Sequence, residues 1–385
     1  MRLGIISDCV HVQHPDGRIG TETHIFLKQI EALSIYFEAV VLVCPFTEYN
    51  EKKVVSYYSI PHLSTIAVPN VGGNSFAAKI KLLQAFPSWI QSFRAVTKST
   101  DIVYQRFPNN LNIPGFFFFY FNRKKVFATY TGTWKNYRNE PLTYRFQKFL
   151  LKHFFRGPIW AYLETADSKN RIIKTFSPSY NQSVWDDEID NVAKRIKKYA
   201  DDSTIELQMI SVGAFNTNKN QQLILNVCLL LRQAQIPFHL TLVGDGILRT
   251  EYETFISKND LQNKVVIAGK KTAEELRELY RKNNIVVQCP LIEGFGKVPI
   301  EGFFHGLIPI VTNVGISKSI IQDGKAGLLI EPNNSDDLLN KLEQIYYKKI
   351  DFSAMILAGR EIAKHQTLEF WAKSYYQTVT EYLKK

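Results

Sequence analysis

The sequence predicts an α/β protein made of two tandem Rossmann-like, doubly wound domains that face a central cleft. Its 385 residues exceed what one hydrophobic core usually serves. In both halves, short apolar runs rich in β-branched residues alternate with amphipathic segments, the pattern of βαβ units around a parallel sheet. We expect a first domain over 1–180, a linker over 181–204, a second domain over 205–360, and a C-terminal helix over 361–385 that packs back toward the first domain.

The first half begins with a βαβ unit. A buried strand at Leu3–Ser7 leads into a polar loop that runs to Gly20, and from Thr21 the apolar spacing becomes helical. Ala39–Cys44 is the next strand, which implies a parallel pair. Further strands are expected at Ile66–Pro69, Ile102–Gln105, Val126–Thr131 and Trp160–Leu163, and helices at Lys79–Thr97 and Leu142–Phe155.

A change in character between Thr175 and Thr204 indicates the linker, because a Ser-Pro-Ser break and an acidic cluster interrupt the pattern there. A second α/β series follows it. Its expected strands are Leu207–Val212, His239–Val243, Val265–Ala268, Ile285–Gln288, Pro309–Thr312 and Gly327–Ile330. Its expected helices are Gln221–Ala234, Leu248–Lys258, Ala273–Lys282, Ile316–Gln322 and Leu338–Tyr347, and an amphipathic segment at Phe370–Leu383 closes the chain.

One stretch of this second series, Cys289–Ile310, places two carboxylates eight positions apart. Glu293 follows the strand Ile285–Gln288 and begins a glycine-containing turn, whereas Glu301 falls in the first turns of the helix after it. Ligands of open α/β sheets bind at the carboxyl ends of strands. The stretch therefore predicts a binding site.

Composition narrows the class of protein. Lysine and arginine exceed the acids by 47 − 36 = 11, which suits phosphate-bearing substrates or an anionic membrane surface as well as an ordinary solvated basic surface. Nucleic acid is not an expected partner, because no zinc-finger spacing or aromatic RNA-binding pattern is present. Four scattered cysteines and the absence of a signal peptide or a long apolar run favour a cytoplasmic protein, peripheral at most to the inner face of a membrane.

Several motifs occur in a fixed order in the second half: SVGAFNTNKN at 211–220, LVGDG at 242–246, VVIAGK at 265–270, EGFGKVPIE at 293–301, GLIPIV at 306–311 and DGKAGLL at 323–329. In this order and spacing the region resembles the donor-binding half of the retaining glycosyltransferases of GT-B fold known as family 4 or glycosyl transferases group 1. The resemblance covers 209–333 well and the first half weakly.

The resemblance implies roles for the two acids. Glu301 would bind the ribose hydroxyls of a nucleotide sugar, since a carboxylate can accept from both hydroxyls of a vicinal diol, and Glu293 would contact the donor sugar. The alternative is that Glu301 only complements a helix start or pairs with Lys297, and that Glu293 is solvated.

A diphosphate needs positive charge and amide donors. Backbone N–H groups at Phe295, Gly296 and Lys297, next to Gly294, would supply donors at a helix start, and Lys219 would add a full charge near the leaving phosphate. The resemblance also places other residues of the motifs at the donor, namely Gly244 and Lys270.

Two departures from the family pattern affect these contacts. Ala214 stands where the family commonly has an arginine on the diphosphate, and we hypothesise that Lys297 supplies the missing charge; the alternative is an ordinary surface lysine. The loop at Gly315 lacks the second glycine and the acid that the family often has there. The family pattern therefore does not predict donor contacts from this loop.

The first half carries fewer signals. Gly20 would bring backbone donors to the phosphates, although the family often has two glycines at this point, and Arg106 and Thr131 are candidates for the acceptor side. The histidine that the family often places near the reactive carbon is not identified. Loop histidines are alternatives: His11, His14 and His24.

We expect no metal and no cofactor, with a UDP- or GDP-sugar as the substrate. The sequence has no His-Glu-x-x-His, cysteine cluster or Asp-x-Asp after an apolar strand. Retention is implied by the resemblance alone, with the leaving phosphate helping to deprotonate the incoming hydroxyl. A glycosidase would instead need two carboxyl groups ~5–5.5 Å apart across the sugar.

Three stretches of the first half mix aromatic and basic residues: Lys79–Arg94, Phe116–Lys125 and Tyr144–Arg156. They suit an anionic membrane interface and a glycan or lipid-linked acceptor, or else are core elements with charged edges. The sequence thus predicts a glycosyltransferase of surface polysaccharide or lipid-linked glycan assembly. The alternatives are a non-catalytic subunit of the same fold that binds a glycan or protein partner, and an epimerase or phosphorylase.

Overall fold

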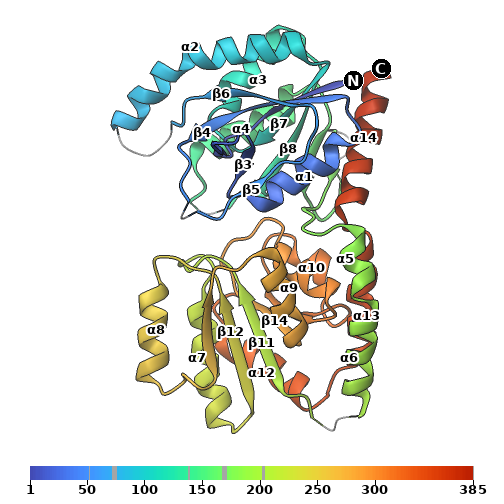
Figure 1. Cartoon of the computed structure of the whole chain (residues 1–385). Helices are drawn as coiled ribbons and strands as arrows, with labels where there is room; N and C mark the ends of the chain where they lie inside the picture. Colours follow the sequence, from blue (N-terminus) through green and yellow to red (C-terminus); the bar gives the residue numbers. More distant parts are fainter. Residues whose placement is uncertain (52, 72–75, 138, 167–170, 202–203, 385) are drawn as a thin grey trace. The chain divides into compact units, whose positions relative to one another are not determined.

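A computed structural model describes residues 1–51, 53–71, 76–137, 139–166, 171–201 and 204–384, which form two compact units (Figure 1). The first unit contains Met1–Ser179 together with Leu368–Lys385, and the second contains Tyr180–Thr367. Each unit is built around its own sheet, as the alternating pattern predicted, and each is described separately below.

The described part of the first unit contains a parallel sheet in the order β6–β4–β1–β7–β8–β9–β10. Its strands are β1 (Arg2–Ile6), β4 (Ala39–Thr47), β6 (Leu63–Val68), β7 (Ile102–Phe107), β8 (Val126–Thr133), β9 (Ile159–Tyr162) and β10 (Ile172–Lys174). The chain adds strands on one side of β1 and then on the other. The strand order therefore reverses between β1 and β7, where a doubly wound sheet opens a crevice for ligands.

The polar loop expected up to Gly20 instead contains two short strands of a small extension of the sheet. This extension consists of β2 (His11–Gln13), β3 (Ile19–Thr21) and β5 (Ser56–Tyr57). In it, β2 pairs with β4 in parallel, and β3 pairs with β2 and β5 in antiparallel fashion. Gly20 is buried in β3, and a Cβ atom at this position would lie 2.6 Å from the Ser56 carbonyl oxygen. Glycine is therefore required here for close strand packing, a reason that the sequence pattern did not reveal.

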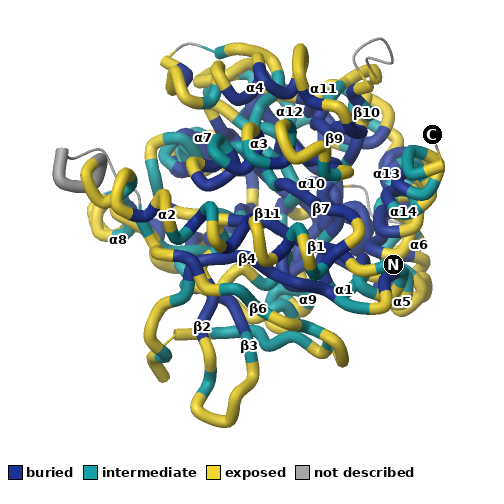
Figure 2. The backbone as a smooth tube through the Cα atoms, turned by 90° about the horizontal axis from the view of Figure 1, so that it is seen from above, coloured by how far each residue is buried: buried dark blue, intermediate teal, exposed yellow. Residues whose placement is uncertain are grey.

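Helices cover both faces of this first sheet, and buried residues line the inner side of each layer (Figure 2). One face packs against α1 (His24–Ser34) and α14 (Leu368–Lys384), which contributes buried Trp371, Tyr375 and Val379. The other face packs against α2 (Phe76–Ser99), α3 (Asn112–Phe121) and α4 (Leu142–Phe154). In α2, Trp89 and Phe93 are core residues.

The second unit contains a parallel sheet whose described strands lie in the order β13–β12–β11–β14–β15–β16. These strands are β11 (Leu207–Val212), β12 (Phe238–Val243), β13 (Val265–Gly269), β14 (Ile285–Gln288), β15 (Ile308–Thr312) and β16 (Leu328–Ile330). The order reverses between β11 and β14. The prediction of Rossmann-like doubly wound sheets is confirmed.

Helices of the second unit also form two layers. One face of its sheet packs against α7 (Gln221–Gln233), α8 (Arg249–Lys258) and α12 (Ser335–Tyr346), and the other against α9 (Ala273–Lys282) and α10 (Lys297–Phe304). A short α11 (Ser317–Ile321) follows β15. Asn334 caps α12 by accepting a hydrogen bond from the Asp337 amide, so the helix begins before the expected Leu338.

The segment expected as a linker is helical and belongs to the second unit. It forms α5 (Gln182–Asp187) and α6 (Ile189–Asp201), and residues 202–203 at its end lie outside the described residues. Arg360, on α13 (Phe352–Lys364), donates to the carbonyl oxygen of Trp185, and the Trp185 indole donates back to the Arg360 carbonyl oxygen. Residues 361–367 also belong to this unit, so the change of unit comes at Leu368. Among the described residues, no helix is long and apolar enough to cross a membrane.

Candidate functional site

The candidate site of the second unit lies where its strand order reverses, at the carboxyl ends of β11 and β14. The loop after β11 carries Lys219, and the loop after β14 carries Glu293. The Lys219 ammonium donates to Glu293 Oε2, and each side chain is 27% exposed. Two charged groups distant in sequence thus meet at the point of the sheet where ligands bind.

Asn218 holds the two loops together. Its side-chain amide donates to the Ile292 carbonyl oxygen over 2.9 Å, and its Oδ1 accepts from the Ile292 amide over 3.0 Å. Its own carbonyl oxygen accepts from the Leu291 amide over 2.8 Å. Because Asn218 precedes Lys219 and Ile292 precedes Glu293, these contacts fix the separation of the two charged residues.

Glycine controls the start of α10. Gly296 is the residue that precedes the helix and has φ 72°, a left-handed conformation that glycine adopts without strain. Phe295 is buried and anchors the turn, while Gly294, Gly296 and Lys297 remain partly accessible. The first turn of α10 thus presents amide groups that lack acceptors within the helix, next to the Lys219–Glu293 pair.

Gly315 supports the Glu293 loop from the other side. It has φ 60°, and a Cβ atom there would lie 2.1 Å from the Glu293 carbonyl oxygen. We expect Gly315→Ala to displace Glu293 and to lower kcat/KM for the donor by about 10²-fold, the cost of an ångström-scale misplacement at a reacting centre. Steady-state donor turnover measures this.

Gly324→Ala is the matched control for Gly315→Ala. Gly324 has φ 78°, yet nothing lies within 4 Å of the added Cβ atom. Both substitutions place alanine in a left-handed conformation at a cost of about 1–2 kcal/mol. Equal losses of turnover in the two variants would show that backbone strain alone, and not displacement of Glu293, causes the effect.

Glu301 is buried on α10 and is held by a tyrosine. The Tyr280 hydroxyl donates to Glu301 Oε2 over 2.8 Å. Burial, together with the charge of Glu301, raises the pKa of Tyr280 well above its usual value, so the phenol stays protonated and remains a donor. Glu301 is therefore oriented before any ligand binds.

A second layer of buried groups supports Tyr280. Its ring stacks on His305 with centroids 5.2 Å apart, and His305 Nδ1 lies 3.3 Å from Glu188 Oε1. Burial lowers the pKa of His305, although Glu188 opposes this effect. Burial alone would raise the pKa of the Glu188 carboxyl, but hydrogen bonds from His305 and Arg281 lower it below its usual value. The array fixes the ring that orients Glu301.

The structure places the other predicted donor residues on the loops after β12 and β13. The Gly244 amide donates to the Gly269 carbonyl oxygen over 2.9 Å, and a Cβ atom at Gly244 would lie 2.0 Å from the Gly213 carbonyl oxygen. Gly244 therefore allows these loops to pack closely. Lys270 is exposed at the end of β13. Strand β12 lies between β13 and β11 in the sheet.

The two acceptor-side candidates of the first unit lie on neighbouring strands. Arg106, near the end of β7, donates to Gln29 Oε1 over 3.4 Å and lies 4.5 Å from the centre of the Phe26 ring. Thr131, on β8, donates to the Phe107 carbonyl oxygen over 3.0 Å. Both lie toward the carboxyl ends of their strands, Arg106 on a strand that flanks the reversal of strand order and Thr131 on the strand next to it.

Asp8 lies beside Arg106, directly after β1. Partial desolvation raises the pKa of the Asp8 carboxyl, and a backbone hydrogen bond, Arg106 and Asn109 oppose the rise. Of the loop histidines, His11 is buried: its ring contacts the Cys9 carbonyl oxygen and the Tyr58 hydroxyl, and burial lowers its pKa to about 4. His14 pairs with Asp16, and His24 Nδ1 lies 2.9 Å from Ser56 Oγ.

Sequence reasoning missed residues that position the site rather than line it. Asn218 stood inside a quoted motif as an unassigned position, and Asp8 could have been found because it follows a buried strand directly. Tyr280, His305 and Glu188 gave no local signal, because their arrangement depends on the packing of α5, α6, α9 and α10. Within the described ranges, no group of three or more His, Cys, Asp or Glu side chains is arranged to hold a metal ion.

Comparison with known families gives a match within the second unit. Residues 193–361 match the sequence model of the family "Glycosyl transferases group 1". The matched region includes Lys219, Glu293 and Glu301, so the candidate site lies wholly within the part of the chain that is similar to this family.

Curated relatives resemble part of the chain. An uncharacterized glycosyltransferase of Methanocaldococcus jannaschii is 34% identical over 153 residues, which are 40% of this chain and 42% of the relative. A D-inositol 3-phosphate glycosyltransferase of Paenarthrobacter aurescens is 24% identical over 214 residues, 54% of this chain and 49% of the relative. The chain spans less than half the length of each relative.

Solved structures resemble the whole chain. A glycosyltransferase of Rickettsia africae matches with a TM-score of 0.69 at 17% identity, over 100% of this chain and 99% of the other. HepE of Anabaena in complex with UDP-glucose matches with a TM-score of 0.70 at 14% identity, over 100% and 99%. The chain therefore has the GT-B fold, with two Rossmann-like units.

Proposed function

We propose that this protein is a glycosyltransferase that moves a sugar from a nucleotide-diphosphate sugar to a hydroxyl group of an acceptor. The observation that carries the proposal is the meeting of Lys219 and Glu293 where the strand order of the second unit reverses. Glu301, on the helix that follows Glu293, is held there by the Tyr280 hydroxyl. The site then brings together a cation for the diphosphate, a carboxylate for the sugar and a carboxylate for the ribose.

Each group has a distinct task in this proposal. Lys219 and the first amides of α10 stabilise the charge that builds on the leaving diphosphate. Glu301 accepts hydrogen bonds from the ribose, and Glu293 accepts from hydroxyls of the donor sugar. In the protein without donor, the ion pair keeps Lys219 and Glu293 close to the positions where they act.

The donor is proposed to be a UDP- or GDP-sugar, with UDP favoured because HepE of Anabaena, a protein of the same fold, is known in complexes with UDP and with UDP-glucose. We propose that no metal is needed, since Lys219, Lys297 and a helix N-terminus offer positive charge to the diphosphate. The proposed stereochemical outcome is retention, with the leaving phosphate taking the proton of the incoming hydroxyl.

The acceptor is proposed to be a glycan or a lipid-linked glycan, and the process surface polysaccharide or lipid-linked glycan assembly in the cytoplasm. The support is the excess of basic residues and the aromatic and basic surface of the first unit. In that unit, Arg106 and Thr131 are proposed to face the acceptor, because both lie near the carboxyl ends of neighbouring strands, one of which flanks the reversal of strand order.

The test is a donor screen. Thermal-shift and hydrolysis measurements with UDP-, GDP- and ADP-sugars, each with and without a metal chelator, should identify one base that stabilises the protein and one sugar that is released. The anomer of the transferred sugar, read by NMR, tests retention. If no nucleotide sugar stabilises the protein or turns over, the transferase proposal fails.

A non-catalytic role is the second candidate. Ala214 favours this candidate, because the site then has one positive charge fewer than the family pattern gives. A binding subunit of this kind would be stabilised by glycan or by a protein partner and not by nucleotide sugars. The same screen therefore separates the two candidates.

We propose that Lys297 compensates for Ala214. Lys297 begins α10 and is partly accessible beside the candidate phosphate position. Lys297→Met should weaken UDP binding about tenfold, as expected for loss of one charge-assisted contact of ~1.4 kcal/mol. Isothermal titration calorimetry measures this, and Lys297→Met combined with Ala214→Arg should recover the affinity. Unchanged affinity in Lys297→Met would make Lys297 a surface lysine only.

A further inference from the structure

Helix α4 of the first unit carries apolar residues on its exposed side as well as on its buried side. It buries Leu150 and Leu151 in the core, together with Gln147 and Lys148, and Lys148 pairs with buried Glu140 over 2.6 Å. It exposes Phe146 and Phe149 to solvent. The buried leucines account for packing on the sheet, so the exposed phenylalanines need another explanation.

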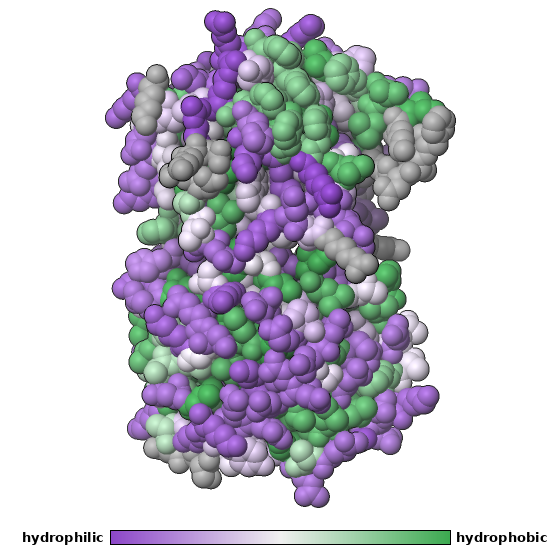
Figure 3. Space-filling model, turned by 180° about the vertical axis from the view of Figure 1, so that it is seen from behind, coloured by the Kyte–Doolittle hydropathy of each residue, from purple (hydrophilic) through white to green (hydrophobic). Residues whose placement is uncertain are grey.

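Helices α3 and α4 both expose apolar side chains. The set is Phe117, Phe121, Leu142, Phe146, Phe149 and Phe154. The ring of Phe116 on α3 lies 6.2 Å, between centroids, from that of Phe155, the residue that follows α4. We call these six residues the aromatic face. Figure 3 shows hydrophobic side chains gathered among hydrophilic ones on the side of the first unit that it views.

Exposed cations accompany the aromatic face in the sequence, namely Arg123, Arg145, Lys152 and Arg156. Glu140 is the single acidic residue between positions 112 and 156; it is buried and pairs with Lys148 over 2.6 Å and with Arg145 over 3.5 Å. The face therefore combines apolar side chains with an excess of positive charge. That combination matches the interface of a lipid bilayer with anionic headgroups.

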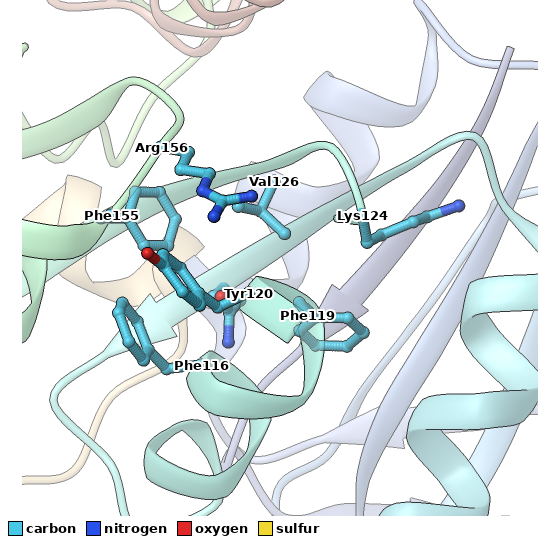
Figure 4. A pocket seen from close by; sticks show the side chains of 8 residues that line it. Phe116, Phe119, Tyr120, Lys124, Val126, Phe155 and Arg156 are labelled. Carbon is cyan, nitrogen blue, oxygen red and sulfur yellow. The ribbon is translucent and has the colours of Figure 1, made fainter. Parts of the chain in front are cut away.

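A small pocket opens beside this face (Figure 4). Phe116, Tyr120 and Phe155 form its aromatic walls, and the Arg156 guanidinium lies 4.0 Å from the centre of the Tyr120 ring. Gln105 also lines the pocket, and its buried Oε1 lacks a hydrogen-bond partner among the described residues. The Arg156 cation is thus held against an aromatic wall next to α3.

We propose that the aromatic face of α3 and α4 docks on an anionic lipid bilayer, with Arg156 at a lipid phosphate. Phenylalanines would enter the boundary between headgroups and acyl chains while the surrounding cations contact headgroups. A second copy of the chain is a poorer occupant, because it would bring the same cations face to face. This inference concerns binding alone and does not depend on the proposed transferase activity.

The experiment is co-sedimentation of the full chain with vesicles of phosphatidylcholine, with and without phosphatidylglycerol. The wild type should bind the anionic vesicles and bind the neutral ones weakly, and added salt should reduce binding. Phe146→Ser with Phe149→Ser should weaken binding about tenfold or more. Arg123→Gln, Lys152→Gln and Arg156→Gln together should weaken it by about 10²-fold, since each cation near an anionic surface contributes about fivefold.

Matched variants on the second unit control for composition and for net charge. Leu357→Ser with Val266→Ser removes apolar side chains that are exposed elsewhere, and the triple change to glutamine at Lys194, Lys258 and Lys264 removes three exposed cations. Both should bind like the wild type. Equal losses in the two cation triples would mean that net charge alone drives binding and would overturn the proposal.

Two other results would also overturn it. One is a wild type that does not bind anionic vesicles while remaining folded by circular dichroism. The other is a concentration-dependent dimer in sedimentation velocity that the phenylalanine variants abolish, without vesicle binding, since the face would then be an interface between copies. These assays contain no nucleotide-sugar donor. A failure to bind vesicles therefore does not test the transferase proposal, and the donor screen does not test vesicle binding.

Discussion

Lys219→Met is expected to lower kcat/KM for the nucleotide-sugar donor by about 10²–10³-fold, the usual cost of removing one preorganised group from a developing negative charge. Lys219 lies on the loop after β11, a loop that Asn218 ties to the loop after β14, so its ammonium group is held near the proposed phosphate position. Initial rates of transfer or hydrolysis over a range of donor concentrations measure the effect. Lys264→Met, on an exposed lysine of the same unit, is the matched control.

A second measurement separates a phosphate contact from a merely structural ion pair. If Lys219 binds phosphate, Lys219→Met should weaken UDP binding, whereas Glu293→Gln should leave UDP binding intact and lower turnover of the sugar donor. If Lys219 only pairs with Glu293, the two single variants and the double variant should lose the same activity, and none should change UDP affinity. That second pattern would contradict the proposed role of Lys219.

The fold could be read from the sequence because its signals are local. The strand Leu207–Val212 and the helix Ala273–Lys282 have the predicted bounds, since apolar spacing and flanking polar residues mark their ends. The Thr272 side chain and Glu275 form a reciprocal cap at the start of that helix. Where an element depends on distant partners, the sequence did not reveal it. Strands β3 and β5 pair although a long stretch of chain separates them, and residues 182–201, assigned to a linker, belong to the second unit and pack on α13.

The candidate site likewise has residues that the sequence indicated and residues that it did not. Glu293, Glu301 and Lys219 were found because their motifs have fixed spacing, and the structure brings Lys219 and Glu293 into contact. The Tyr280 hydroxyl could not have been found, because its approach to Glu301 requires α9 and α10 to pack on the same face of the sheet. The sequence also gave no reason to expect phenylalanines of α4 in solvent and Lys148 inside.

Glu301→Gln is expected to lower kcat/KM by about 10²-fold for a donor with an intact ribose, mainly through KM, and to lower it little for the 2′-deoxy donor. A carboxylate can accept from both ribose hydroxyls, whereas an amide offers one acceptor oxygen. The variant keeps an acceptor for the Tyr280 hydroxyl, so the protein should remain stable. Glu301→Ala should also lower the melting temperature, because a buried phenol without an acceptor costs about 1–3 kcal/mol.

Discrimination between the ribose donor and its 2′-deoxy analogue is the decisive readout, because a purely structural role of Glu301 would not change it. Tyr280→Phe serves as the positioning control: it keeps the ring on His305 but releases Glu301 Oε2, and it should reduce the discrimination by about tenfold. If Glu301→Gln retains the wild-type preference for the ribose donor, then Glu301 does not bind ribose. Its buried hydrogen bond with Tyr280 would in that case serve only to hold α10 against α9.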